Sequence, residues 1–145
     1  MMQNWILYAC LQQLSRFYAC SQLQYINAAI CAPTPILRRF LEERAFERLD
    51  FISDLEVAME GGDRENRVGP LMEEVFQRHL NLYGQNSLSM SGDGDFMDTD
   101  FKIIEICNLL LSHDLLPSFR RLLRYHLLKV ESARLSMYYL KTLYP

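Results

Sequence analysis

The chain has 145 residues, of which half are hydrophobic and 23% are charged, and its formal net charge is −3. This length suits one domain with a buried core, so we expect a single domain over residues 1–145. Because nucleic acids and anionic membranes attract clustered Lys and Arg, the slightly acidic balance argues against both as partners.

The cysteine pattern indicates a reducing environment. No two cysteines form a C-x-x-C pair, and none has a histidine at zinc-finger spacing. The first residues lack the basic start of a signal peptide, and no apolar run is long enough to span a bilayer. We therefore expect a cytoplasmic protein whose thiols are free. These are Cys10, Cys20, Cys31 and Cys107.

Apolar residues recur at spacings of three and four from residue 7 to residue 29, which is typical of a helix with one buried face. We expect this first helix to run from about Gln3 to Cys31. Prolines at 33 and 35 end it, because proline lacks a backbone donor and restrains the residue before it. Thr34 is placed to cap a second helix, from Pro35 to about Glu60, which the Gly-Gly pair at 61–62 should stop.

The second segment has an apolar side and a charged side. Opposite charges four residues apart, such as Arg38 and Glu42, lie on the charged side and favour the helix. We expect Arg48 to lie with these charged residues and the apolar side to face the core. The residues expected to be buried are Leu37, Leu41, Ala45, Leu49, Ile52, Val57 and Met59.

The rest of the chain also predicts helices. A third helix is expected from about Pro70 to Tyr83, followed by a polar linker over 84–99 that is rich in Ser, Gly and Asp. The next helix, from Phe101 to Ser112, is apolar nearly all round, which indicates burial on most sides. No run of alternating β-branched residues predicts a strand, so the chain reads as an all-α antiparallel bundle.

The last helix is expected from about Pro117 to Leu143. Its apolar positions alternate by fours and threes without a break, which is a heptad-like seam. Such a seam predicts one continuous face against the core. It consists of Phe119, Leu123, His126, Val130, Ala133, Met137, Leu140 and Tyr144.

Short motifs lie near the ends of these helices. They are Tyr25 with Ala28 and Ala29; Thr34-Pro35 with Leu37; Glu47-Arg48 with Phe51 and Leu55; Gly61-Gly62-Asp63; and Asp114-Leu115-Leu116-Pro117 with Arg120, Leu122, Leu123 and Leu127. Over nearly the whole chain they resemble a bacterial branch of the ferritin-like proteins, the YciE/YciF-like stress proteins and their relatives. The resemblance implies a ferritin-like antiparallel four-helix bundle with an additional short helix, often paired as a dimer. It also implies that the helix at Phe101 begins earlier.

A ferritin-type di-iron site needs carboxylates from two helices and a Glu-x-x-His motif from each of two others. No glutamate here is followed by histidine three residues later, and no acid lies between Trp5 and Cys31. So sparse a set cannot hold two iron ions, and we expect no metal, no other cofactor and no catalytic residue. The residues left for an altered site are Glu47, Asp50, Asp100 and His126.

Two of these residues have alternative interpretations. Glu47 shares a helix face with Asp50, so the two could be remnant ligands, although an ion pair between Glu47 and a base on another helix is favoured. His126 could be a ligand or a pH switch, since imidazole titrates near neutrality. A core histidine with one hydrogen bond is the favoured interpretation.

Two functions from different classes remain open. The first is a non-catalytic bundle that acts in stress physiology through a homodimer or a partner protein. The second is a metal-binding oxidative enzyme of the ferritin-like di-metal carboxylate class with an altered or degenerate site. The missing Glu-x-x-His motifs favour the first. Aromatic residues also favour it, since interfaces are enriched in them, unless they simply complete the core; these are Trp5, Tyr8, Tyr138, Tyr139 and Tyr144.

Overall fold

The computed structural model describes residues 4–62 and 94–143. These residues form four α-helices and no strand: α1 (Asn4–Ile30), α2 (Pro35–Gly62), α4 (Phe96–Leu111) and α5 (Pro117–Leu143). The all-α prediction is therefore confirmed. The third helix predicted from Pro70 to Tyr83 lies outside the described residues.

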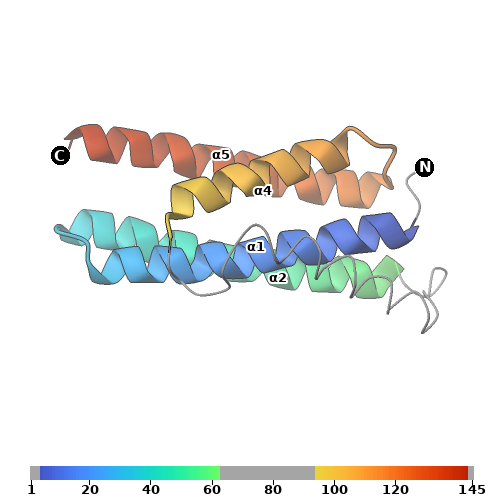
Figure 1. The fold of residues 1–145 in the computed structure, drawn as a ribbon, viewed down its shortest axis with the longest axis horizontal. Coiled ribbons are helices and arrows are strands. Elements are labelled where there is room, and N and C mark those ends of the chain that lie inside the picture. Colours follow the sequence, from blue (N-terminus) through green and yellow to red (C-terminus); the bar gives the residue numbers. More distant parts are fainter. Residues whose placement is uncertain (1–3, 63–93, 144–145) are drawn as a thin grey trace.

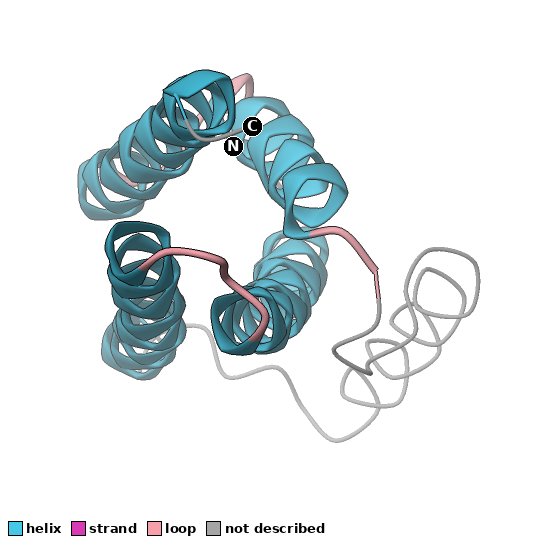
Figure 2. Cartoon of the chain, turned by 90° about the vertical axis from the view of Figure 1, so that its left-hand side faces the viewer, coloured by secondary structure: helices cyan, strands magenta, loops and turns pink. Residues whose placement is uncertain are grey.

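The four helices lie side by side as a bundle (Figures 1 and 2). Around the ring, α1 packs along both α2 and α4, and α4 packs along α5, whereas α2 and α5 make the sparsest contact. Each neighbouring pair runs antiparallel, and α2 ends near the opposite end of the bundle from the start of α4 (Figure 1). The seam between α2 and α5 is therefore the loosest side of the bundle.

The start of α4 corrects the predicted linker over 84–99. The helix begins at Phe96 rather than Phe101, because Asp95 caps it with extended backbone and its side chain accepts a hydrogen bond from the Met97 N–H. Gly94 precedes the cap with a φ of +106°, a conformation that glycine adopts without strain. Residues 94–99 of the predicted linker thus form a helix start, whereas residues 84–93 lie outside the described residues.

The helix seams follow the 3–4 spacing. In α5 the predicted residues from Phe119 to Met137 are buried, as expected, and Leu140 is half-buried. In α1 the same spacing buries polar residues among apolar ones. The buried series in α1 is Leu11, Leu14, Tyr18, Ser21 and Tyr25.

The buried side of α2 differs from the prediction in two ways. Leu49 and Val57 are exposed, at 44% and 66%, whereas Arg48 is completely buried. The buried positions Leu41, Ala45, Arg48 and Leu55 keep the spacing of four and three, so Arg48 occupies a core position in register with its apolar neighbours. The prediction placed Arg48 on the surface, because arginine side chains are rarely completely buried.

Large apolar side chains remain on the outer surface of α5. Leu128, Leu135, Tyr138 and Tyr139 are between 62% and 70% exposed. None of the described helices is both long and apolar enough to cross a bilayer.

Candidate functional site

A polar layer divides the interior of the bundle. On one side of it lies an apolar cluster that includes Leu14, Phe51 and Leu123, and on the other lies a second cluster that includes Tyr25 and Leu41. The layer draws on three helices, and every member is at most 2% exposed. Its residues are Ser21 and Gln24 from α1, Arg48 from α2, and Thr99 and Asp100 from α4.

Asp100 is the centre of this layer. Its Oδ2 accepts hydrogen bonds from Arg48 Nη2 at 3.1 Å and from the Tyr25 hydroxyl at 2.5 Å. Its Oδ1 accepts one from the Ser21 hydroxyl at 2.8 Å. A buried carboxylate is costly unless it is paired and hydrogen-bonded, and both oxygens of Asp100 meet that requirement.

The guanidinium of Arg48 is equally well partnered. It lies between the rings of Tyr25 and Phe51, 5.3 and 5.4 Å from their centroids, and its Nη1 donates to Glu47 Oε1 at 2.9 Å. Burial opposes its charge, but the carboxylate of Asp100 outweighs burial and raises the pKa of Arg48. Arg48 therefore stays charged inside the bundle, and its pair with Asp100 links α2 to α4 across the interior.

His126 of α5 lies in a second buried contact, with Tyr18 of α1 and Asp54 of α2. Its Nε2 lies 3.0 Å from Asp54 Oδ2, and because a carboxylate only accepts, Nε2 carries the ring hydrogen and donates it. In the neutral ring Nδ1 then accepts from the Tyr18 hydroxyl at 2.9 Å. The imidazole also stacks on Phe51, with 4.0 Å between ring centroids. Burial lowers the pKa of His126 while Asp54 acts in the opposite direction, and the imidazole is neutral at pH 7.

The order carboxylate, imidazole, hydroxyl is that of an acid–base triad. Here it has no access to substrate, because Tyr18 and His126 are completely buried. Burial also raises the pKa of Tyr18 well above its ordinary value of 10.0, so the phenolate needed for nucleophilic attack does not form near neutral pH. The arrangement therefore holds three helices together rather than activating a nucleophile.

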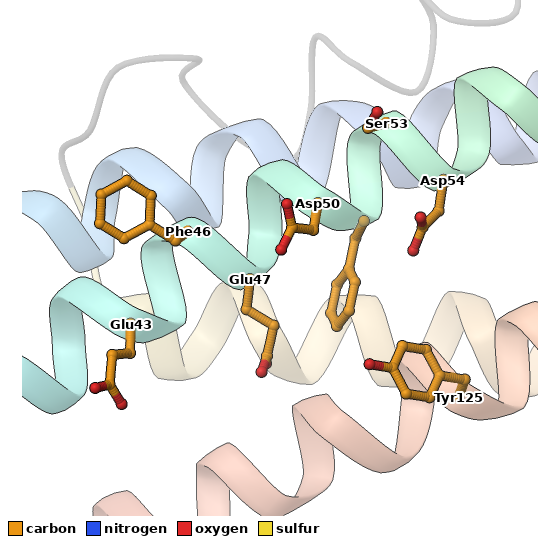
Figure 3. Close-up of a pocket in the computed structure, with 8 residues that line it drawn as sticks. Glu43, Phe46, Glu47, Asp50, Ser53, Asp54 and Tyr125 are labelled. Carbon is orange, nitrogen blue, oxygen red and sulfur yellow. The ribbon is translucent and has the colours of Figure 1, made fainter.

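A groove of about 610 Å³ lies at the loose seam between α2 and α5 (Figure 3). Four carboxylates of α2 border it at spacings of four, three and four, and the ring of Tyr125 reaches in from α5. Asp54 is 41% exposed and connects this groove with His126. The lining residues are Glu43, Phe46, Glu47, Asp50, Phe51, Ser53, Asp54 and Tyr125.

The predicted site residues occupy separate places. Glu47 and Asp50 line the groove, whereas Asp100 and His126 lie in the interior with other partners. Glu47 does pair with a base, but the base is Arg48 on the same helix rather than one on another helix. The ion pair between helices is made by Asp100 instead.

The donor set does not fit a ferritin-type metal centre. Asp100 already faces the guanidinium of Arg48, whose positive charge would repel a cation placed beside it. Nowhere in residues 4–62 and 94–143 do three or more His, Cys, Asp or Glu side chains gather in a way that could hold a metal ion. Asp100 and Glu47 instead pair with Arg48, and Asp54 with His126.

Sequence reasoning missed most of the residues that make these contacts. Asp100 and His126 were candidates, but Arg48 was assigned to the surface and Ser21 was not considered. One signal could have found Arg48: it falls on the 3–4 spacing that runs through Leu41, Ala45 and Leu55. The other missed partners are Tyr18, Tyr25 and Asp54.

No family model, curated protein or solved structure matches this chain. The ferritin-like resemblance therefore stays a prediction drawn from short sequence motifs. What the chain does must be inferred from the side chains that it buries and from those that it exposes.

Added metal should leave the stability of this protein unchanged. Because Asp100 is held by Arg48 and His126 by Tyr18, we expect Fe²⁺, Mn²⁺ or Zn²⁺ to produce no rise in melting temperature. Calorimetry with and without each ion measures this, with Glu47→Gln as the matched variant. A rise in the wild type that Glu47→Gln abolishes would instead identify Glu47 as a metal ligand.

Proposed function

We propose that this chain is a non-catalytic bundle of the ferritin-like type that acts by assembling with a second copy of itself. One observation carries the proposal: the outer surface of α5 exposes Leu128, Leu135, Tyr138 and Tyr139. The helical spacing of these residues places them on the same side of α5, and an apolar patch exposed on one side of a helix is typical of an interaction site. The exposed tyrosines are also the residue type that interfaces favour.

The buried polar groups support a non-catalytic role. Asp100 is hydrogen-bonded to Arg48, and His126 to Tyr18, and all four side chains are completely buried, so none of them is accessible to a substrate. The alternative, a metal-binding oxidative enzyme with an altered site, needs free ligands that point inward. The metal titration described above tests that alternative directly.

Two further observations agree with the proposal. Because α2 ends and α4 begins at opposite ends of the bundle, the helices need one long crossover connection, as ferritin-like bundles do (Figure 1). The four cysteines are free, which suits the reducing cytoplasm. Likeness to stress proteins then supports a role in stress physiology.

Light scattering coupled to gel filtration tests assembly. At high micromolar concentration we expect the measured molar mass to be twice the 17.1 kDa of a single chain. The physical reason is that pairing removes the apolar surface of α5 from water. A mass of 17.1 kDa throughout the accessible concentration range would refute the proposed function.

A further inference from the structure

The outer face of α5 matches itself when two copies lie antiparallel, and we propose that it forms an isologous dimer interface in one register. In this register Leu128 packs on the partner's Leu135, and Arg124 packs on the partner's Tyr139. The inference rests on the proposed function, because it specifies which face the second copy covers.

The geometry of the helix defines this face. Leu128, Leu135 and Tyr139 are separated by seven and four residues, so at 3.6 residues per turn they form one stripe. They are 62%, 64% and 66% exposed. The stripe lies on the side of α5 opposite Val130 and Met137, which are buried against the other helices. A partner can therefore reach it without disturbing the core.

The order of residues along the stripe is self-complementary. In an antiparallel pair centred between Glu131 and Ser132, each residue meets the partner residue at the same distance on the other side of that centre. Leu128 and Leu135 are equally far from the centre, and so are Arg124 and Tyr139. Two leucine contacts are thus flanked by two arginine–tyrosine contacts, which are favourable cation–π pairs. A two-fold axis produces each contact twice.

The neighbouring surface supports the same register. An apolar groove of about 460 Å³ between α4 and α5 borders Leu135 and Tyr138, and it is lined also by Met97 and Ile104. Because the partner's Leu128 packs on Leu135 in this register, it enters the groove. The groove gives the leucine a pocket rather than a flat contact.

Two charged residues, Glu131 and Arg134, also line this groove. The guanidinium of Arg134 stacks over Phe101 at 5.2 Å. In the proposed register the partner's Glu131 lies about two residues along the helix from Arg134 and on the same side. An ion pair between Arg134 and the partner's Glu131 offsets the repulsion between the two Glu131 side chains, which lie near the two-fold axis.

Substitutions on the stripe test the choice of face. We expect Leu128→Asp and Leu135→Asp to halve the solution mass to 17.1 kDa, since each places two charges in an apolar contact. Val57→Asp, at an equally exposed position on α2, should keep the dimer mass. Far-ultraviolet circular dichroism and melting confirm that all three variants stay folded. Dimers that survive both leucine substitutions would overturn the inference.

A cysteine placed at the centre tests the register without disturbing the interface. In a Cys31→Ser background, Ser132→Cys should cross-link two copies nearly completely under air oxidation, because the two residues lie next to each other across the axis. Thr142→Cys should not cross-link, since it lies opposite the partner's Arg121, roughly 30 Å from its own copy. Cross-linking at 142 but not at 132 would contradict the register.

These experiments separate failure of the inference from failure of the proposed function. A wild-type dimer whose mass is insensitive to Leu128→Asp, and which gives no cross-link at Ser132, assembles through another face. The proposed function then stands and the inference is wrong. A wild-type monomer refutes both.

Discussion

Asp100→Asn is expected to lower the free energy of unfolding by about 3–5 kcal/mol. The change removes the negative charge but leaves the guanidinium of Arg48 completely buried, with only its contacts to Glu47 and Ser21. Arg48 then keeps only the partly exposed Glu47 as a counter-charge, so much of the desolvation cost that the attraction to Asp100 offsets is no longer compensated. Urea denaturation at neutral pH measures the difference between variant and wild type.

Two control variants show whether the loss in Asp100→Asn comes from the buried charge of Arg48. Replacing both partners, as in Arg48→Met with Asp100→Leu, should recover much of the loss, because no completely buried charge remains and Glu47 keeps Arg44 as a partner. Glu105→Gln removes an exposed pair with Lys102 and should cost less than about 1 kcal/mol. A loss for Asp100→Asn no larger than that for Glu105→Gln would show that the polar layer is not a structural element.

His126→Ala is expected to lower the free energy of unfolding by about 2–5 kcal/mol at neutral pH. The ring is completely buried and stacked on Phe51, so its removal leaves a cavity. The Tyr18 hydroxyl also loses its acceptor in a place that water reaches poorly. Thermal unfolding with calorimetry measures the change, and a loss below about 1 kcal/mol would contradict this packing role.

Acid should weaken the wild type through the same residue. The pKa of His126 in the fold lies below its ordinary value of 6.5, because burial disfavours the imidazolium. Between those two pKa values the unfolded chain binds more protons than the folded chain, so stability falls as the pH drops below about 6.5 and stops falling below the folded pKa. This part of the pH dependence should be absent from His126→Ala.

The charged groups that face the imidazole shape this dependence. The carboxylate of Asp54 raises the pKa of His126, whereas the guanidinium of Arg48 lowers it. Asp54→Asn should therefore lower that pKa further and enlarge the stability lost in acid. Nuclear magnetic resonance titration of the His126 ring follows the pKa directly. An unchanged or higher pKa in Asp54→Asn would contradict the assigned contact.

The fold was largely predictable from the sequence, because its helices follow local rules. The seam of α5 from Phe119 to Met137 repeats without interruption, and the Pro-Thr-Pro turn at 33–35 separates α1 from α2 as expected. The local pattern placed the start of α4 too late, at Phe101, whereas the family resemblance implied an earlier start. The helix is capped by one hydrogen bond, which the Asp95 side chain accepts from the Met97 N–H. The acidic composition around Asp95 is also typical of a loop, so it did not identify the cap.

The interior site was much less predictable, because its residues are defined by partners distant in the sequence. Arg48 is buried only because Asp100, 52 residues later, arrives beside it. His126 depends on Tyr18 at a separation of 108 residues. No local pattern encodes either contact. Helical periodicity identifies a core position, but it does not show which polar residue will be paired there.

The polar layer and the exposed stripe have different physical roles. The pair of Arg48 and Asp100 contributes little net stability relative to apolar residues, but it penalises any register of α2 and α4 that separates the charges. The stripe on α5 adds nothing to the monomer and gains its stabilisation only when it is covered. We therefore expect substitutions in the layer to alter unfolding and those on the stripe to alter assembly.

The concentration dependence of unfolding tests most directly whether assembly is part of this protein's native state. When a dimer unfolds to separate chains, mass action makes the native state more stable at higher protein concentration. We predict that the urea midpoint of the wild type rises steadily as the chain concentration is increased a hundredfold, and that Leu135→Asp abolishes the rise. A wild-type midpoint that is the same at every concentration would contradict the account.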